Sequence, residues 1–545
     1  MIRIISLLII CIPLLSEGQD WLSLQNFGGS GFSQGVKIRR GEAGTIYVGG
    51  HLQNNNIGKS TFTVLCDTLE SLNNEPYGVS SFIIKYDNKN SIIWKRNAPG
   101  RIEDFIVDEN ANCYVVGYFE YTLIINGEPY YPIGFGEGYA LKYNSQGDIL
   151  WIKILTGDQF NRINSVGISK MGDIILSGVN NSQSTLLPNT VLPTGSFVAK
   201  LNPSNGQINS SKIFSTEQLW VSTLSVDNSD NIILGGTYED GVVFNNELYT
   251  SQNSSHDGFI AKLDKDLNEI WFKSVGSDNI LYSEEVKAIK SDETGYYFSG
   301  VYSDKLTIDS HEIESKGEID TYAAKLNLDG DLEWISTIGG ESRERIFDLS
   351  INESFVCVTG EFSSEIEFPD KTHNPLGYSD IMVVKYLKNG EYVDSYTGGG
   401  SQNQSDFLYT DIGISILVDE QNDIYVTGKL SGPGYFSNIS YKVNGSSDYF
   451  IGIISEDKPS FENSDCEYSS PMISVYPNPT YGNINILSDN TILGLSIIDS
   501  FGREISSFAS LSNYSQMDIS HLPSGLYIFN FNTKAGKKYI RVIKI

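Results

Sequence analysis

A repeat of about 60 residues runs through most of this chain. Its first signature is an aromatic or apolar residue, two small or apolar residues and a lysine, as in FIIKY, YALKY and FIAKL, and successive lysines lie 57 to 63 residues apart. A period of this size predicts a repeat architecture. A degenerate seventh copy, YFIGIIS, has Ile453 in place of lysine. The lysines are Lys85, Lys142, Lys200, Lys262, Lys325 and Lys385.

Two further signatures define each unit. A short β-rich run closed by glycine occurs seven times, mostly after turn-forming Asn, Asp or Gly, which predicts a hairpin between two strands. A tryptophan follows the lysine by nine residues in four units (Trp94, Trp151, Trp271 and Trp334), whereas Asn209 and Asp394 occupy this position in two others. Each unit therefore supplies about four strands, as the blades of β-propellers do. The closing glycines are Gly50, Gly117, Gly178, Gly236, Gly300, Gly360 and Gly428.

The two ends of the repeat array are complementary. The mature chain begins with a tryptophan strand at Trp21, and the last repeat ends with its lysine-type strand at Tyr449 to Ile453. We expect the N-terminal strand to complete the last blade, because a closed ring has no free sheet edges. The sequence thus predicts an all-β, seven-bladed β-propeller of four-stranded blades over residues 19–455.

Residues that recur in most blades are interpreted as architecture. Asp257, Asp320 and Asp380, five residues before the lysine, are expected to cap the turn that enters the strand. The lysines are expected at exposed or edge positions. Trp271 is expected to lie largely buried between adjacent blades.

The repeat resembles a known family. Its FxxK strand, the Gly339-Gly340 pair after a tryptophan strand and the run from Asp419 to Gly428 resemble the SBBP-type β-propeller repeats of secreted bacterial proteins. The resemblance covers residues 20 to 455. It implies a fold and does not imply a function.

A separate module follows the repeats. Residues 456–471, EDKPSFENSDCEYSSP, have the composition of a linker between domains. Residues 472–545 alternate strands with Gly/Pro turns and predict a small Ig-like β-sandwich. The motif residues are Tyr476, Pro477, Asn478, Pro479, Gly482, Asp499, Gly502, Arg503, Leu522, Pro523, Gly525 and Tyr527.

These motifs, in this order, resemble the C-terminal sorting domain of the type IX secretion system of Bacteroidetes. The resemblance implies that the secretion machinery is a partner of this module and that the protein is secreted or placed on the cell surface. Residues 1–18, with Arg3, an apolar core and small residues before Gln19, predict a signal peptide. No later segment reaches the apolar length of a transmembrane helix.

Charge and cysteine content exclude several classes of function. The formal net charge of −29 disfavours binding to nucleic acid and to anionic membrane surfaces. The chain has no CxxC motif, so a structural zinc site is not expected. Cys113 and Cys357 fall in strand-like runs and are expected to be buried. Cys66 and Cys466 lie in irregular segments and are the candidate disulfide pair.

No catalytic constellation stands out in the sequence. Gly31 to Gly35 fits G-x-S-x-G but lies between β-strands, where a nucleophile elbow does not form. The Asp/Asn clusters at 227–231 and 419–423 are interpreted as hairpin turns, with calcium ligation as the alternative. No other cofactor is expected. The histidines are scattered, without metal-ligand spacing: His51, His256, His311, His373 and His521.

Three functions remain open at this point. A non-enzymatic binding or adhesion protein for an extracellular glycan or protein is favoured. A propeller enzyme would need non-repeated residues at the channel mouth, for which Glu341, Glu344 and Asp348 are the candidates. A passive surface-layer component is the third. Non-repeated loops at residues 51–80 and 398–411 are candidate binding segments.

Overall fold

The computed structural model describes most of the chain. The described residues are 19–28, 31–54, 61–64, 67–70, 78–98, 100–125, 128–186, 190–214, 218–251, 256–276, 284–400, 410–443, 446–455, 473–476, 480–488, 492–499, 502–511, 514–533 and 536–545. The predicted signal peptide and linker, and Cys66 and Cys466, lie outside them. The chain divides into two compact units, Met1–Glu462 and Asn463–Ile545.

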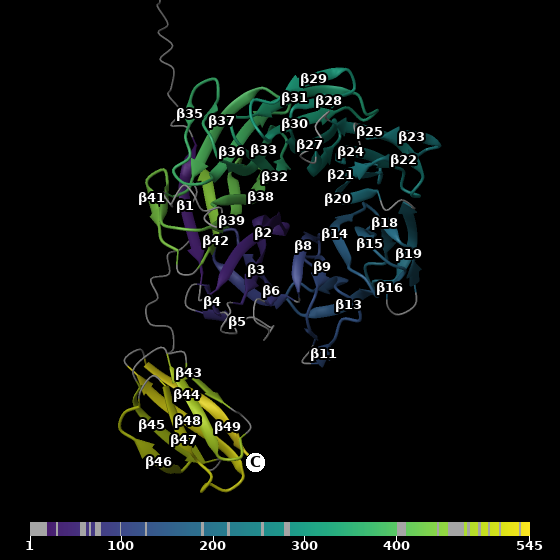
Figure 1. Cartoon of the computed structure of the whole chain (residues 1–545). Coiled ribbons are helices and arrows are strands. Elements are labelled where there is room, and N and C mark those ends of the chain that lie inside the picture. Colours follow the sequence, from purple (N-terminus) through teal and green to yellow (C-terminus); the bar gives the residue numbers. More distant parts are fainter. Residues whose placement is uncertain are drawn as a thin grey trace, which may run out of the picture. The chain divides into compact units, whose positions relative to one another are not determined.

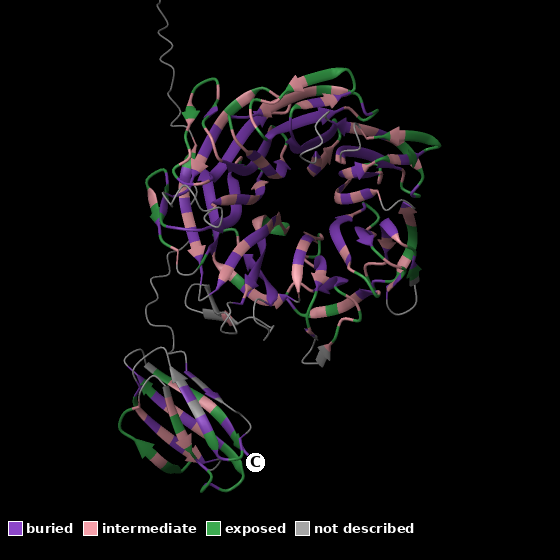
Figure 2. Ribbon diagram, viewed as in Figure 1, coloured by how far each residue is buried: buried purple, intermediate pink, exposed green. Residues whose placement is uncertain are grey.

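The first unit consists of small antiparallel sheets, and the prediction of an all-β chain is confirmed. In residues 20–455, seven of the described sheets contain a four-strand meander, and in Figure 1 these sheets surround a common axis with the first strand innermost. Buried residues concentrate along the sheets, and exposed residues lie mainly toward the outside of the ring (Figure 2).

Six of these meanders are continuous in sequence. They are β2 (Phe32–Arg40), β3 (Ile46–Gln53), β6 (Val79–Tyr86) and β7 (Ile92–Ala98); β8 (Arg101–Val107), β9 (Cys113–Phe119), β12 (Glu137–Tyr143) and β13 (Ile149–Thr156); β14 (Asn161–Ile168), β15 (Ile174–Asn180), β18 (Gly195–Leu201) and β19 (Ile208–Phe214); β20 (Leu219–Val226), β21 (Ile232–Glu239), β24 (His256–Leu263) and β25 (Glu269–Gly276); β26 (Glu285–Asp292), β27 (Gly295–Tyr302), β30 (Asp320–Leu326) and β31 (Leu332–Ile338); and β32 (Glu344–Ile351), β33 (Phe355–Phe362), β36 (Asp380–Leu387) and β37 (Tyr392–Gly398).

The remaining meander joins the two ends of the array. It contains β38 (Ile412–Val418), β39 (Ile424–Leu430), β42 (Asp448–Ser455) and β1 (Asp20–Phe27). β1 pairs antiparallel with β42, from Asp20 opposite Ser455 to Phe27 opposite Tyr449. The prediction that Trp21 to Phe27 lies beside the last repeat strand is confirmed. The Trp21 indole also donates to the Thr397 carbonyl of the preceding sheet, at 2.9 Å.

Short hairpins connect the second and third strands of the meanders. Two of them, β16–β17 and β28–β29, pair with β13 and β25 and thereby cover the outer edges of neighbouring sheets. The hairpin strands are β4 (Thr61–Val64), β5 (Asp67–Glu70), β10 (Leu123–Ile125), β11 (Glu128–Tyr130), β16 (Ser184–Leu186), β17 (Thr190–Leu192), β22 (Gly241–Phe244), β23 (Glu247–Thr250), β28 (Lys305–Ile308), β29 (His311–Glu314), β34 (Ile366–Glu367), β35 (Thr372–His373), β40 (Gly434–Phe436) and β41 (Ile439–Tyr441). A 3-10 turn, η1 (Glu42–Gly44), follows β2.

The repeat signature forms a clasp between consecutive sheets. Each Lys-Trp pair lies directly opposite across two strands, as with Lys142 and Trp151. In two pairs, Lys85–Trp94 and Lys142–Trp151, both side chains donate to one carbonyl in the outer turn of the next sheet. Lys142 Nζ and Trp151 Nε1 reach the Pro203 oxygen at 3.0 and 3.1 Å. The ammonium also lies 4.8 Å from the centroid of the Tyr114 ring, a favourable cation–π contact. The expectation of exposed or edge positions is therefore wrong for most of these lysines: Lys142, for example, is 8% exposed on the third of four strands, and only Lys200 is partly exposed.

The tryptophan of the clasp requires a glycine in the turn of the next sheet. In the sheet that follows each Trp, the turn residue facing the indole is glycine with positive φ: Gly147, Gly206, Gly330 and Gly390. A Cβ on Gly390 would lie 2.6 Å from Trp334 Cδ2, so a side chain does not fit there. Where Asn209 replaces Trp, the next turn has Leu267 at a φ of 69° instead. A tryptophan in one repeat and a glycine in the next are thus one structural unit.

We expect Trp271→Ala to destabilise the protein by about 3 kcal/mol, because its half-buried ring packs on Gly330 and the core beneath it. Asn209→Ala is the matched control, since Asn209 is exposed at the equivalent position, and its melt is expected to be unchanged. Calorimetric melts of both variants make the comparison. An unchanged Trp271→Ala melt would mean that the indole is not part of the interface between sheets.

The second unit has two sheets around one core. Its strands are β43 (Ile473–Tyr476), β44 (Asn483–Ser488), β45 (Ile492–Asp499), β46 (Glu504–Phe508), β47 (Tyr514–Asp518), β48 (Gly525–Thr533) and β49 (Gly536–Lys544). The sheet orders are β43-β44-β47 and β46-β45-β48-β49. Ile486, Phe529 and Val542 are fully buried within this unit.

Candidate functional site

The innermost strands share a β-bulge at the same place. In all seven described meanders the register between the first and second strands shifts by one residue near the start of the inner strand. Such a bulge leaves an extra residue without a ladder partner and re-aims its side chain. The backbone feature repeats, but the side chain at the bulge does not. The seven bulge residues are Val36, Glu103, Asn164, Ser222, Lys287, Phe347 and Ile414.

The bulge residues divide the inner strands into two arcs. Four consecutive strands, β8, β14, β20 and β26, carry polar or charged bulge residues, and β32, β38 and β2 carry apolar ones. The four polar bulge residues line a cavity of about 610 Å³ together with Lys37, Arg39 and Asp348. This cavity is the candidate functional site.

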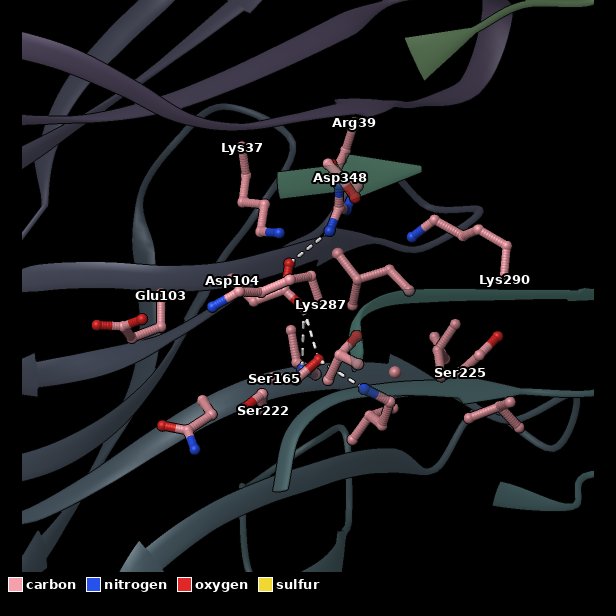
Figure 3. A pocket seen from close by; sticks show the side chains of 18 of the residues that line it. Lys37, Arg39, Glu103, Asp104, Ser165, Ser222, Ser225, Lys287, Lys290 and Asp348 are labelled. Atoms are coloured by element: carbon pink, nitrogen blue, oxygen red, sulfur yellow. Dashed lines mark hydrogen bonds and ion pairs between the residues drawn. The ribbon is translucent and has the colours of Figure 1, made fainter. Parts of the chain in front are cut away.

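An ion-pair cluster lies at the centre of the cavity wall (Figure 3). Arg39 Nη2 is 2.6 Å from Asp104 Oδ1, and Arg39 Nη1 is 3.7 Å from Asp348 Oδ2. Asp104 and Asp348 are 5% and 1% exposed. The guanidinium of β2 therefore joins a carboxylate of the neighbouring strand β8 to a carboxylate of β32, which lies beyond β38 on the other side.

The same carboxylates also bond to serines of the next sheets. Asp104 accepts from Ser165 Oγ at 2.9 Å, and that oxygen in turn accepts the Leu224 N–H at 3.3 Å. Asp348 accepts from Ser415 Oγ, which in turn accepts the Ile38 N–H. These bonds link β8 to β14 and β20, and β32 to β38 and β2. Both aspartates therefore help to hold the inner strands together.

The electrostatic environment keeps both aspartates ionised. Burial alone would raise the pKa of Asp348, but Lys37, Lys290 and Arg39 together lower it to about 2. The pKa of Asp104 is likewise lowered, since Arg39 and Lys37 outweigh the effect of burial. Burial raises the pKa of Glu103, with Arg162 opposing the shift. Burial, with the nearby Arg39, lowers the pKa of the Lys290 ammonium to about 8.

Of the three enzyme candidates from the sequence, only Asp348 lines this cavity. Glu341 is exposed. Glu344 is fully buried, and it accepts the Gly340 N–H at 2.8 Å and Ser364 Oγ at 2.9 Å, which fixes the loop before β32. Sequence reasoning missed Arg39 and Asp104. Both residues could have been found from the sequence, because each is a charged residue that does not recur in most of the other repeats and lies on the strand that follows a tryptophan strand.

Other residues named from the sequence have structural contacts. Ser33 of the G-x-S-x-G match is 1% exposed and its Oγ accepts the Tyr449 N–H. Asp320 and Asp380 accept N–H groups four residues earlier, at 2.7 and 2.6 Å, as expected of turn caps. Cys113 and Cys357 are buried free thiols, as predicted. Half of the candidate loop at 51–80, and residues 401–409 of the candidate loop at 398–411, lie outside the described residues.

The Asp/Asn clusters satisfy their own turns. Asp227 accepts the backbone N–H groups of Ser229 and Asn231, and Asp419 does the same for Gln421 and Asp423. Among the residues that the structure describes, no group of three or more His, Cys, Asp or Glu side chains is arranged to hold a metal ion. In the same part of the chain no helix has the length and apolar character needed to cross a membrane.

The motif residues of the second unit form its turns. Asp499 accepts the Arg503 N–H and pairs with its guanidinium at 2.8 Å. Tyr527, packed in the core with Leu522, donates to the Pro523 carbonyl at 2.8 Å. Gly482 has a φ of 151° against the Ser520 backbone, and Gly502 a φ of 80°. Gly525 begins β48; the Tyr476 side chain and Pro477, Asn478 and Pro479 lie outside the described residues.

Comparison with protein families identifies this unit. Residues 474–545 match the family described as secretion system C-terminal sorting domain. The chain carries an export signal of the type IX system. It is therefore a secreted or cell-surface protein, and its sorting domain implies interaction with the secretion machinery. A search among curated proteins finds no relative at a significant level.

Solved structures give only distant likenesses. The quinohemoprotein alcohol dehydrogenase of Comamonas testosteroni is 9% identical with a TM-score of 0.33, and the match covers 79% of this chain and 76% of that one. A bifunctional GH43-CE protein of Bacteroides eggerthii is 9% identical with a TM-score of 0.29, covering 83% and 68%. PorZ, a surface component of the type-IX secretion system of Porphyromonas gingivalis, is 9% identical with a TM-score of 0.17, covering 96% and 100%. These TM-scores are too low to bear on function.

Proposed function

We propose that this chain is a non-enzymatic binding protein that the type IX system exports. Residues 19–455 form a closed, seven-bladed β-propeller of the SBBP type, and residues 472–545 an Ig-like sorting domain. The β1–β42 pairing supports closure of the ring. The turns built by Asp499–Arg503 and by Pro523–Tyr527 shape the domain that the machinery recognises.

The binding function is inferred from the two aspartates of the cavity, whose carboxylates are already engaged in ion pairs and hydrogen bonds within the protein. Asp104 and Asp348 are ionised, paired with Arg39 and bonded to serines of neighbouring strands. A general acid needs a carboxyl group that keeps its proton near neutral pH, and neither aspartate meets that need. The unrepeated bulge residues form a polar wall on a rigid frame, which suits ligand binding.

A glycan-cleaving enzyme is the second candidate, and one observation favours it. The pKa of Glu103 is raised by burial, whereas the pKa values of Asp104 and Asp348 in the same cavity are lowered. Carboxyl groups whose pKa values are pushed apart are typical of acid and base pairs in glycosidases.

One experiment separates the two functions. The mature chain is incubated with panels of extracellular polysaccharides and proteins, and retention on each ligand is measured together with the release of new reducing ends or peptides. Binding without product formation is expected. Product formation that Glu103→Gln abolishes while retention persists would establish the enzyme instead. Absence of retention on every ligand would contradict both functions and leave a passive surface component.

A further inference from the structure

The charge of the cavity is opposite to that of the chain. Five cationic side chains and four carboxylates line the cavity, although the whole chain has a formal charge of −29. The acidic residues therefore lie predominantly elsewhere. The cavity is a local site of positive charge on an acidic protein, which favours an anionic ligand there and disfavours one over the remaining surface.

Part of this charge is not neutralised within the cavity. Arg39 is paired with both aspartates, and Lys287 Nζ lies 2.5 Å from Glu285 Oε2. Within the described residues, no carboxylate lies within ion-pair distance of Lys37, Arg162 or Lys290. Lys37 and Lys290 extend from opposite sides toward the cluster that contains Asp348 (Figure 3).

The second feature of the cavity is a buried amide oxygen, on Asn164, that lacks a hydrogen-bond donor. Asn164, the bulge residue of β14, is 7% exposed, and its Nδ2 donates to the Val221 carbonyl at 2.6 Å. The residue lines the cavity, and its Oδ1 is buried without a hydrogen-bond partner. A buried acceptor without a donor is unfavourable. A hydroxyl group of a bound ligand would supply the missing donor, and the Ser222 hydroxyl of the next bulge is beside it in the ring order.

We propose that the cavity binds a carboxylated sugar unit of an acidic saccharide, with its carboxylate at Lys37 and Lys290 and a ring hydroxyl at Asn164. The cations supply charge-assisted hydrogen bonds to the carboxylate. The amide oxygen selects a hydroxylated ligand over a simple anion. This assignment rests on the proposed binding function and names its ligand class.

The test is calorimetric titration of the mature chain with a tri-uronate and with the matching neutral trisaccharide. The uronate is expected to bind and the neutral sugar to bind at least about tenfold more weakly. Lys37→Met and Lys290→Met are each expected to weaken uronate binding about tenfold, while Lys290→Arg retains it. Asn164→Leu is expected to weaken it about threefold. Lys265→Met is the control, because Lys265 lies on an exposed turn beside Asp266, and no change is expected.

Several outcomes would overturn the proposal. Equal binding of the neutral and acidic sugars would exclude the charge as the determinant. Unchanged uronate binding in Lys37→Met and Lys290→Met would place the ligand elsewhere. Binding of a sulfated trisaccharide or an acidic peptide in place of the uronate would refute the carboxylated sugar. If no saccharide binds but the panel of polysaccharides and proteins yields another ligand, this inference fails and the binding function stands.

Discussion

Removal of residues 472–545 is expected to leave the N-terminal unit folded and to stop its passage through the outer membrane. The match to the sorting family lies within the deleted segment, and the two units have separate hydrophobic cores. Export of the truncated chain is expected to fall by at least about tenfold. Cell fractionation measures its location, and the melt of the purified truncated chain measures its fold.

A gain-of-function control completes this prediction. Residues 456–545 fused behind a periplasmic reporter are expected to carry the reporter outside the cell. If the truncated chain appeared outside at the normal level, the sorting assignment would be wrong. If it failed to fold, its retention would have to be attributed to misfolding, and the independence of the two units would be refuted.

Replacement of Arg39 by Met is expected to destabilise the protein by about 3 kcal/mol at neutral pH. The substitution leaves Asp104 and Asp348, both nearly inaccessible to solvent, without their shared cation. Arg40→Met is the matched control, since the neighbouring Arg40 pairs with the exposed Glu420 at the surface. Its loss is expected to change stability by less than about 1 kcal/mol.

The pH dependence gives a second readout for Arg39. In the native protein the pKa of Asp348 is lowered from its ordinary value of 3.8 to about 2. Its stabilising effect is therefore present above the unfolded pKa and lost as the pH falls from about 4 toward 2. The difference in unfolding free energy between the native protein and Arg39→Met is expected to be largest above about pH 5 and to shrink in acid. A difference independent of pH would mean that Arg39 acts by packing alone.

The sequence predicts the repeated sheets of the first unit because the residues that form the interface between consecutive sheets recur in most repeats. Lys142 and Trp151 donate to the Pro203 carbonyl of the next turn, and Trp151 faces the glycine of that turn; the spacing of these residues along the chain repeats with the period. The sequence nevertheless mispredicts the lysines, because nothing in it distinguishes a surface lysine from Lys142, whose ammonium lies over the Tyr114 ring and donates to the Pro203 carbonyl.

The candidate site was harder to predict for a related reason. Arg39, Asp104 and Asp348 are far apart in the chain, each occurs once, and none belongs to a motif. Their proximity depends on closure of the ring, which places β8 and β38 beside β2, with β32 next to β38. The β-bulge that presents Asn164 and Lys287 has no recognisable sequence, since seven different residues occupy it. Only the three-dimensional arrangement gathers these residues into a cavity.

An experimental structure of the exported, mature protein would test the closed ring directly. We expect seven four-stranded blades around one axis, with β1 as the outer strand of the β38–β39–β42 sheet and Arg39 between Asp104 and Asp348. Six or eight blades, or β1 and β42 in different sheets, would contradict the closed ring and the central cavity that depends on it.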